Sequence, residues 1–223
     1  MNEAFRVLRT NVDLMLGKNA QSRVIMFTSF NPAAGKTFSI MNLAASMALK
    51  KSKVIIVDLD LRKATLTKTF GKQHSGVAAY LNGKMDDYHS CIDELSSDLF
   101  LLPIGTLPPN PTELLLTERF GKMIDELRKE YDYVFLDCPP IDIVADASII
   151  SSVADMTIFI MRAGLMDKRI LPLVEELYQS GKYKHMALVL NIVDVHHKKY
   201  GYGRYGYGYG YGYGYGYGYG NQD

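Results

Sequence analysis

Residues 23–46 read RVIMFTSFNPAAGKTFSIMNLAAS, and this stretch decides the fold. Its first six residues, 23–28, form an apolar run of the kind found in buried strands. A loop follows and ends in Gly35-Lys36-Thr37, after which apolar side chains recur at helical spacing. Strand, loop, Gly-Lys-Thr and helix, in that order, are the context of a phosphate-binding loop.

The residue types of this loop match the chemistry of phosphate binding. Backbone N–H groups of the loop and of the helix N-terminus point toward phosphate oxygens. Lys36 can reach the terminal oxygens, and the hydroxyl of Thr37 can ligate Mg²⁺. The general pattern has glycine at position 30, where this chain has Phe30. An ordinary strand-to-helix turn that happens to contain Gly-Lys-Thr is therefore the competing interpretation of the loop alone.

The same alternation of strand and helix continues along the chain. Apolar runs predict strands at 23–28, 53–58, 98–102, 132–137, 155–161 and 186–192. Helical spacing or composition marks residues 3–16, 36–50, 113–130 and 167–180. Because the apolar runs are continuous rather than alternating, the strands are expected to be covered on both faces. The pattern predicts an α/β fold of the P-loop NTPase class, with a doubly wound, mostly parallel sheet flanked by helices.

The composition changes abruptly after Val195. Residues 196–223 consist of His-His-Lys-Lys followed by tyrosine and glycine alternation up to Gly220. Such a segment has no aliphatic side chains to bury, so it cannot offset the entropy cost of ordering. We therefore expect one folded domain over 1–195 and a disordered C-terminal tail over 196–223.

The overall composition excludes several classes of protein. The formal net charge is +1, from 25 basic and 24 acidic residues, so nucleic acid is not expected as a partner. The two cysteines, Cys91 and Cys138, form no CxxC pair, which argues against a disulfide framework or a zinc site and favours the cytoplasm. No apolar run reaches the length of a membrane span, so the chain is predicted to be soluble or the soluble part of something larger.

Two further strands end in carboxylates. Residues 54–62 read VIIVDLDLR, and residues 134–140 read VFLDCPP. Asp58 and Asp137 are therefore predicted at the carboxyl edge of the sheet, where the phosphate loop also opens. Taken singly, each could simply cap the next turn or helix. Together, carboxylates beside a triphosphate would repel it unless a divalent cation lay between them, so the grouping implies Mg²⁺.

Several motifs in combination carry a specific resemblance. They are Ser-x-x-Pro-x-x-Gly-Lys-Thr at 29–37, Asp-x-Asp-x-Arg at 58–62, Asp-x-x-Pro at 137–140, Glu-x-x-Arg-x-x-Arg at 3–9, Pro-Pro-Asn-Pro-x-Glu-Leu at 108–114 and the tyrosine-rich C-terminus. With these motifs the chain resembles the bacterial tyrosine kinases that control capsular and exopolysaccharide export. The resemblance implies a kinase unrelated in fold to eukaryotic protein kinases, which binds ATP and Mg²⁺, assembles into a ring and phosphorylates the tails of its neighbours.

The resemblance also implies roles for individual residues. The nucleotide would be bound by Asn31, Pro32, Ala33, Ala34, Gly35, Lys36, Thr37 and Phe38, with Asn191 on the adenine edge or serving only as a turn residue. The metal would be organised by Thr37, Asp60 and Asp137. The catalytic set would be Lys36, Asp58, Asp60 and Arg62. Within this set, Asp58 would accept the proton of the tyrosine or only orient its hydroxyl. Arg62 would steady phosphate or the tyrosine loop, and the alternative for Arg62 is an ordinary surface ion pair.

Assembly and regulation follow from the same resemblance. Glu3, Arg6 and Arg9 would dock one subunit against the next. The acceptors would be the tail tyrosines, which are Tyr200, Tyr202, Tyr205, Tyr207, Tyr209, Tyr211, Tyr213, Tyr215, Tyr217 and Tyr219. Expected partners are further copies of the chain, in a ring sensitive to phosphorylation, a transmembrane activator domain or subunit, and a tyrosine phosphatase. The domain would act in the cytoplasm at the inner face of the plasma membrane, through a membrane-spanning partner or a missing N-terminal region.

The chain departs from the family pattern at two loop positions. Ala33 and Ala34 stand where relatives usually carry glycine and an acidic residue. If position 33 needs a positive φ, alanine costs roughly 1–2 kcal/mol there, which would weaken ATP binding. One alternative is a positioning or partitioning ATPase, but those proteins carry a lysine where this chain has Asn31. Another is a non-enzymatic regulator that uses the aromatic tail as an adhesive segment.

Overall fold

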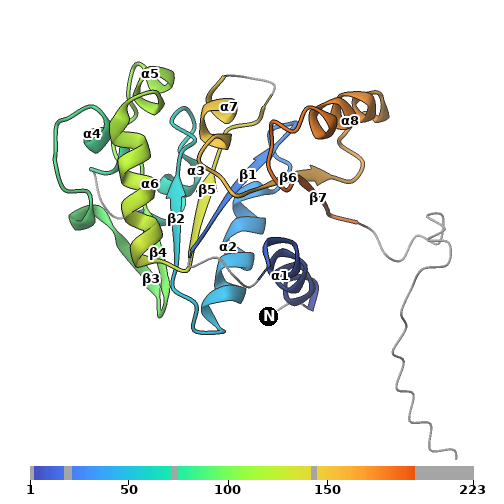
Figure 1. The fold of residues 1–223 in the computed structure, drawn as a ribbon, viewed down its shortest axis with the longest axis horizontal. Helices are drawn as coiled ribbons and strands as arrows, with labels where there is room; N and C mark the ends of the chain where they lie inside the picture. The colour runs from blue at the N-terminus through green and yellow to red at the C-terminus, as the bar shows by residue number, and fades with distance from the viewer. Residues whose placement is uncertain (1–2, 18–21, 72–74, 142–144, 194–223) are drawn as a thin grey trace, which may run out of the picture. The chain divides into compact units, whose positions relative to one another are not determined.

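The computed structural model describes residues 3–17, 22–71, 75–141 and 145–193 (Figure 1). The predicted tail and its boundary at residue 196 lie outside the described residues. The principal elements are α1 (Glu3–Leu16), β1 (Arg23–Ser29), α2 (Lys36–Ala48), β2 (Val54–Asp58), α3 (Thr65–Phe70), α4 (Val77–Leu81), η1 (His89–Cys91), β3 (Asp93–Ser96), β4 (Leu99–Leu102), α5 (Pro111–Leu115), α6 (Glu118–Glu130), β5 (Tyr133–Asp137), α7 (Asp146–Ser151), β6 (Met156–Arg162), η2 (Lys168–Ile170), α8 (Leu171–Gln179) and β7 (Ala187–Asn191).

The sheet confirms the predicted doubly wound architecture. Its strand order is β3-β4-β2-β5-β1-β6-β7, and every neighbouring pair is parallel except β3 with β4. The six predicted strands are all present. The antiparallel edge strand β3 was not predicted, because Asp93–Ser96 (DELS) is short and polar and forms a strand only by pairing with β4.

Both faces of the central strands are buried. Along β1, Val24 and Met26 pack into one apolar cluster, whereas Ile25 and Phe27 pack into the other. The first cluster includes side chains of α4, α6 and α7, and the second includes those of α1 and α2. This two-sided burial explains why the strands read as continuous apolar runs. No helix among the described residues is long and apolar enough to cross a membrane.

Parallel pairing aligns the ends of three strands. Asp137 at the end of β5 lies opposite Asp58 of β2 and opposite Phe27 of β1. β1 runs on into the glycine-containing loop that precedes α2. The strand order therefore brings the phosphate loop and both carboxylates to one edge of the sheet, as the strand-end pattern predicted.

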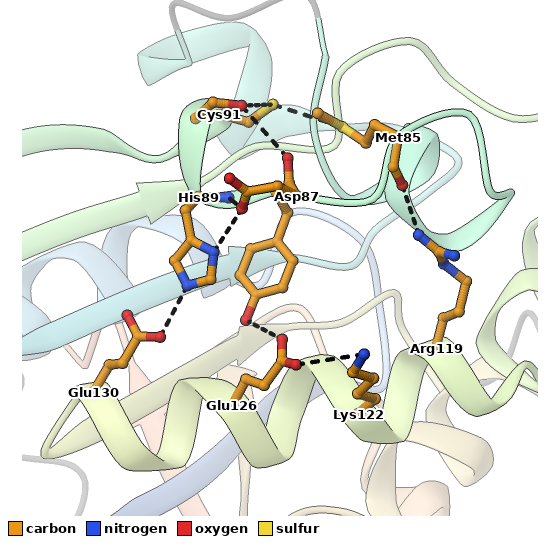
Figure 2. A network of polar contacts seen from close by, with 10 residues as sticks. Met85, Asp87, His89, Cys91, Arg119, Lys122, Glu126 and Glu130 are labelled. Carbon is orange, nitrogen blue, oxygen red and sulfur yellow. Dashed lines mark hydrogen bonds and ion pairs between the residues drawn. The ribbon is translucent and has the colours of Figure 1, made fainter.

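A polar network attaches η1 to α6 (Figure 2). His89 bonds Asp87 Oδ1 through Nδ1 at 2.7 Å and Glu130 Oε1 through Nε2 at 2.8 Å. The adjacent Tyr88, which is buried, donates its hydroxyl to Glu126 at 3.1 Å. Carboxylates only accept hydrogen bonds, so both ring nitrogens of His89 are satisfied when the imidazole is protonated. The network is therefore most favourable when His89 is protonated.

We expect His89→Gln to lower the melting temperature more at pH 5.5 than at pH 8.5. Partial burial alone would lower the pKa of His89, but the hydrogen bonds to Glu130 and Asp87 outweigh it and raise the pKa. The stabilisation is therefore complete below the unfolded value of about 6.5 and is lost as pH rises through the folded value. Thermal unfolding of the parent and of His89→Gln between pH 5.5 and 8.5 measures the difference in melting temperature. A difference that grows as pH rises would contradict the prediction.

Candidate active site

The phosphate loop contains two residues in the left-handed backbone region. Ala33 has φ of 60°, and Gly35 has φ of 91°. Such residues turn successive N–H groups toward one point, which creates a concave anion site. Glycine is required at position 35 for a further reason, because a Cβ there would collide with the amide of Asn191. Ala33 thus has the positive φ considered in the sequence analysis, at which alanine costs about 1–2 kcal/mol. The weaker ATP binding expected from that cost stays a prediction.

Phe30 replaces the motif glycine without obstructing the loop. Its side chain is 2% exposed and stacks on Phe159 with ring centroids 5.2 Å apart. The backbone of Phe30 has a negative φ, since it is not among the residues with positive φ. The ring therefore packs into the core beneath the loop and leaves the phosphate side open.

The loop surrounds a cavity of about 260 Å³. Most of the predicted nucleotide-binding residues line it, together with Asp60. The complete lining is Ser29, Pro32, Ala33, Ala34, Gly35, Lys36, Thr37, Phe38, Asp60, Lys63, Thr65 and Pro140. Sequence reasoning gave no binding role to Ser29 and Pro140, although both belong to the quoted motifs at 29–37 and 137–140. It missed Lys63 and Thr65 because no quoted motif extends to them. Asn31 is absent from this lining and borders a smaller neighbouring pocket with Arg162.

Lys36 forms a buried ion pair with Asp137. Its Nζ lies 3.1 Å from Asp137 Oδ1, and the two side chains are 12% and 3% exposed. Burial alone would lower the pKa of Lys36, but the carboxylates of Asp137 and Asp60 outweigh burial and raise it. Burial raises the pKa of Asp137, and Lys36 opposes that shift. Lys36 is therefore held as a cation beside the phosphate loop.

Asp58 is completely buried and connects the end of β2 to Thr67 of α3 by hydrogen bonds. Its Oδ2 accepts hydrogen bonds from the backbone N and the hydroxyl of Thr67, at 2.8 and 2.7 Å. Its Oδ1 accepts the backbone N–H of Asp60 at 3.2 Å. Burial and the neighbouring charge of Asp137 raise the pKa of Asp58 to about 7, against the hydrogen bonds from Thr67. A carboxylate whose pKa is near neutrality is a better proton acceptor than an ordinary aspartate. To accept a proton on Oδ2, however, Asp58 would have to lose a hydrogen bond from Thr67.

The donor set of the cavity fits Mg²⁺. The hydroxyl of Thr37 and the carboxylate of Asp60 both line it and are hard oxygen ligands. Asp137 lies beside them but is bonded to Lys36. Within the described ranges, no three His, Cys, Asp or Glu side chains are grouped to hold a metal ion alone. That arrangement agrees with the way Mg²⁺ binds in nucleotide sites, through one or two protein oxygens plus phosphates and water.

Arg62 forms an ion pair with Asp146. Its Nε is 3.4 Å from Oδ2 of Asp146, a carboxylate that is 1% exposed, and the hydroxyl of Thr112 donates to the other oxygen at 2.6 Å. Arg62 does not line the cavity. It holds the segment after β2 against α5 and α7, because a buried carboxylate left without a cation would be costly. The ion pair that the sequence analysis gave as the alternative is therefore present, with the Arg62 side chain 39% exposed and its partner buried. The role of Arg62 toward phosphate or the tyrosine loop stays a prediction.

Asn191 contacts the phosphate loop directly. Its Nδ2 donates to the carbonyl of Ala34 at 3.1 Å, and its Oδ1 accepts the N–H of Ile192 at 2.9 Å. Asn191 is thus more than a turn residue, because it braces the loop at Gly35. The predicted contact with adenine stays a prediction.

The predicted assembly stripe divides into two parts. Glu3 and Arg6 are exposed and pair with each other at 3.2 Å. Arg9 instead donates to the backbone oxygen and the hydroxyl of Ser46 in α2, at 2.6 and 3.1 Å. Because Arg9 fastens α1 to the body of its own subunit, only Glu3 and Arg6 present charge freely to a neighbour. The ten predicted acceptor tyrosines lie outside the described residues.

Comparison with known proteins identifies the family. A family model described as an AAA domain matches residues 22–168. The tyrosine-protein kinase CpsD of Streptococcus pneumoniae serotype 4 is 38% identical over 202 residues, which cover 89% of this chain and 87% of that protein. This chain belongs to the bacterial tyrosine-protein kinases. The CpsD kinase of Streptococcus agalactiae is 32% identical over 204 residues, covering 90% of this kinase and 88% of that relative.

A solved structure agrees with this assignment. The kinase domain of the Escherichia coli tyrosine kinase ETK superposes with a TM-score of 0.79 at 28% identity, over 96% of this kinase and 80% of that chain. Family membership thus favours a kinase over the partitioning ATPase and the non-enzymatic regulator. It agrees with the presence of Asn31 where the partitioning proteins carry a lysine.

Proposed function

We propose that this kinase binds ATP·Mg²⁺ in the loop cavity and transfers the terminal phosphoryl group to tyrosines of its own C-terminal tail, in trans. The observation that carries the proposal is the convergence of the left-handed loop, Lys36, Thr37 and Asp60 on one cavity. In the transfer, the bond from the γ-phosphorus to the bridging oxygen breaks as the phenol oxygen bonds to phosphorus. ADP leaves with the electron pair, and the phenolic proton passes to a base, for which Asp58 is the candidate.

The residues of the site would divide the work. Backbone N–H groups of the loop and Lys36 would bind and orient the phosphates, and Thr37 and Asp60 would hold the metal, with Asp137 in support. Mg²⁺ supplies charge neutralisation between the phosphate oxygens when bound. Catalysis would rest on positioning and electrostatics, because phosphoryl transfer has a loose transition state that needs little covalent assistance.

The distribution of tyrosines favours the tail as acceptor. Six of the sixteen tyrosines lie in the described domain, and five of these are buried, namely Tyr80, Tyr88, Tyr131, Tyr133 and Tyr183. Among them only Tyr178 is exposed, at 59%. A buried tyrosine cannot enter the site of another subunit unless its own domain opens. The Tyr-Gly tail faces no such barrier, because its composition has little to bury.

We further propose that the kinase forms a ring that loosens on phosphorylation. A transmembrane activator would hold it at the inner face of the plasma membrane, a tyrosine phosphatase would reverse the modification, and the output would be control of capsule or exopolysaccharide synthesis or export. Exposed Glu3 and Arg6 are the residues of α1 that support contact with a neighbour.

The central proposal is tested by incubating the purified chain with ATP·Mg²⁺ and measuring its intact mass, with EDTA as the control. A series of added phosphates, recognised by a phosphotyrosine antibody and mapped to residues 200–219, is the expected result. Release of inorganic phosphate without labelling would instead indicate an ATPase. Neither labelling nor phosphate release would indicate a non-catalytic regulator, and either outcome would overturn the proposal.

A further inference from the structure

Lys63 supplies a second cation to the nucleotide cavity. It lines the cavity together with Asp60, Thr65 and the residues of the phosphate loop. Among the described residues, no carboxylate lies within ion-pairing distance of its ammonium group. Lys36 pairs with Asp137, Arg62 pairs with Asp146, and Arg162 donates to the carbonyl of Ala33 at 3.4 Å. Of the two lysines that line the cavity, Lys63 is the one without an ion-pair partner among the described residues.

The backbone before Lys63 is held by a series of hydrogen bonds. Asp60 accepts the N–H of Lys63 through both its carboxylate and its carbonyl oxygen, each at 3.2 Å. The same carbonyl accepts the N–H of Ala64 at 2.9 Å, and Ala64 adopts a left-handed φ of 50°. Asp60 is itself tied to Asp58. This turn sends Arg62 toward Asp146 and leaves Lys63 at the cavity.

The charges around the cavity call for such a cation. A triphosphate would meet the carboxylate of Asp60 in the cavity, and Lys36 is already neutralised in part by the buried carboxylate of Asp137. In a phosphate loop, backbone N–H groups hold the inner phosphates, so the terminal phosphate extends toward the strand ends. Asp60 follows the end of β2, and Lys63 lies three residues beyond it. A flexible lysine that lines the same cavity as Lys36 can reach the terminal phosphate of a nucleotide bound there.

We propose that Lys63 is a further catalytic residue that binds the terminal phosphate of ATP and offsets its charge during transfer to tyrosine. This inference rests on the proposed function for the identity of the ligand. It assigns to Lys63 the phosphate-steadying role that sequence reasoning gave to Arg62. Lys63 therefore distinguishes ATP from ADP, because only ATP carries the phosphate that it contacts.

The test compares Lys63→Gln with the parent chain in equilibrium binding of ADP·Mg²⁺ and of a non-hydrolysable ATP analogue with Mg²⁺. A hydrogen bond to a charged group contributes about 1.5–3 kcal/mol, so affinity for the analogue is expected to fall about 10-fold or more. Affinity for ADP is expected to change by less than about twofold. The initial rate of tyrosine phosphorylation should fall with the analogue affinity, and Lys63→Arg should retain most of both.

Lys68→Gln is the matched control. Lys68 is exposed on α3, five positions from Lys63, and does not line the cavity. It should leave both affinities and the rate unchanged, and thermal unfolding should show that both variants are folded. Equal losses for ADP and the analogue, or no loss for either, would overturn the proposal. The binding measurement involves no phosphoryl transfer, so it tests Lys63 independently of the proposed function. If the parent chain binds both nucleotides but labels no tyrosine, the proposed function is contradicted, and the binding comparison still tests the role of Lys63.

Discussion

Lys36→Met is expected to reduce tyrosine phosphorylation by at least about 10³-fold. Lys36 is the only cation among the described residues that is buried beside the phosphate loop, and the charge of Asp137 and Asp60 keeps it protonated. Methionine fills a similar volume but cannot offset charge on the outer phosphates. The measurement is the initial rate of tail labelling with purified protein. Labelling at the rate of the parent would remove Lys36 from the mechanism.

The same substitution affects stability, which must be separated from catalysis. Without Lys36, the buried carboxylate of Asp137 has lost its cation, and breaking such a pair costs about 3–5 kcal/mol if the charge persists. Burial already raises the pKa of Asp137, so protonation relieves part of this cost. The variant should therefore be less destabilised as pH falls. Combining Lys36→Met with Asp137→Asn should restore stability, which tests the cost of the unpaired carboxylate. Because Asp137 is also proposed to support the metal, the lost rate is assigned to Lys36 by showing through thermal unfolding that Lys36→Met alone is folded at the assay temperature.

The central sheet could be predicted because its signal is local. Each of the six predicted strands is a continuous apolar run, and in β1, β2 and β5 burial on both faces leaves no alternative use for such a run. The short helices α3, α4 and α7, of five or six residues each, were not predicted, and the single helix predicted over 113–130 is divided in the structure into α5 and α6. Segments this short carry less than two turns of periodicity, so tertiary contacts decide their conformation.

In the site, too, contacts within one segment could be predicted, whereas contacts between distant segments could not. The loop from Pro32 to Phe38 was predicted residue by residue, because one continuous backbone segment forms it. The ion-pair partner of Arg62 could not be predicted, because Asp146 lies 84 residues further along the chain. Arg9 likewise bonds Ser46, which belongs to another helix. Helical spacing places side chains on a face, but it does not say which neighbour that face meets.

Replacing the ten tail tyrosines between 200 and 219 by phenylalanine is expected to make assembly of the kinase insensitive to ATP·Mg²⁺. The parent should assemble when unphosphorylated and dissociate after incubation with ATP·Mg²⁺. Each phosphate adds about −1.5 to −2 charges, so five would shift a subunit by roughly −8 to −10. The unmodified chain has a formal charge of only +1, so neighbouring subunits would change from nearly neutral to strongly repelling.

Light scattering at one protein concentration, before and after incubation with ATP·Mg²⁺, measures this change. Tyr178→Phe is the matched control, because Tyr178 is the exposed tyrosine of the described domain. It should dissociate like the parent, whereas the tail variant should stay assembled. High salt should reduce the difference, since screening weakens repulsion between exposed charges. Dissociation of the tail variant on incubation with ATP·Mg²⁺ would show that nucleotide binding, rather than tail phosphate, releases the subunits.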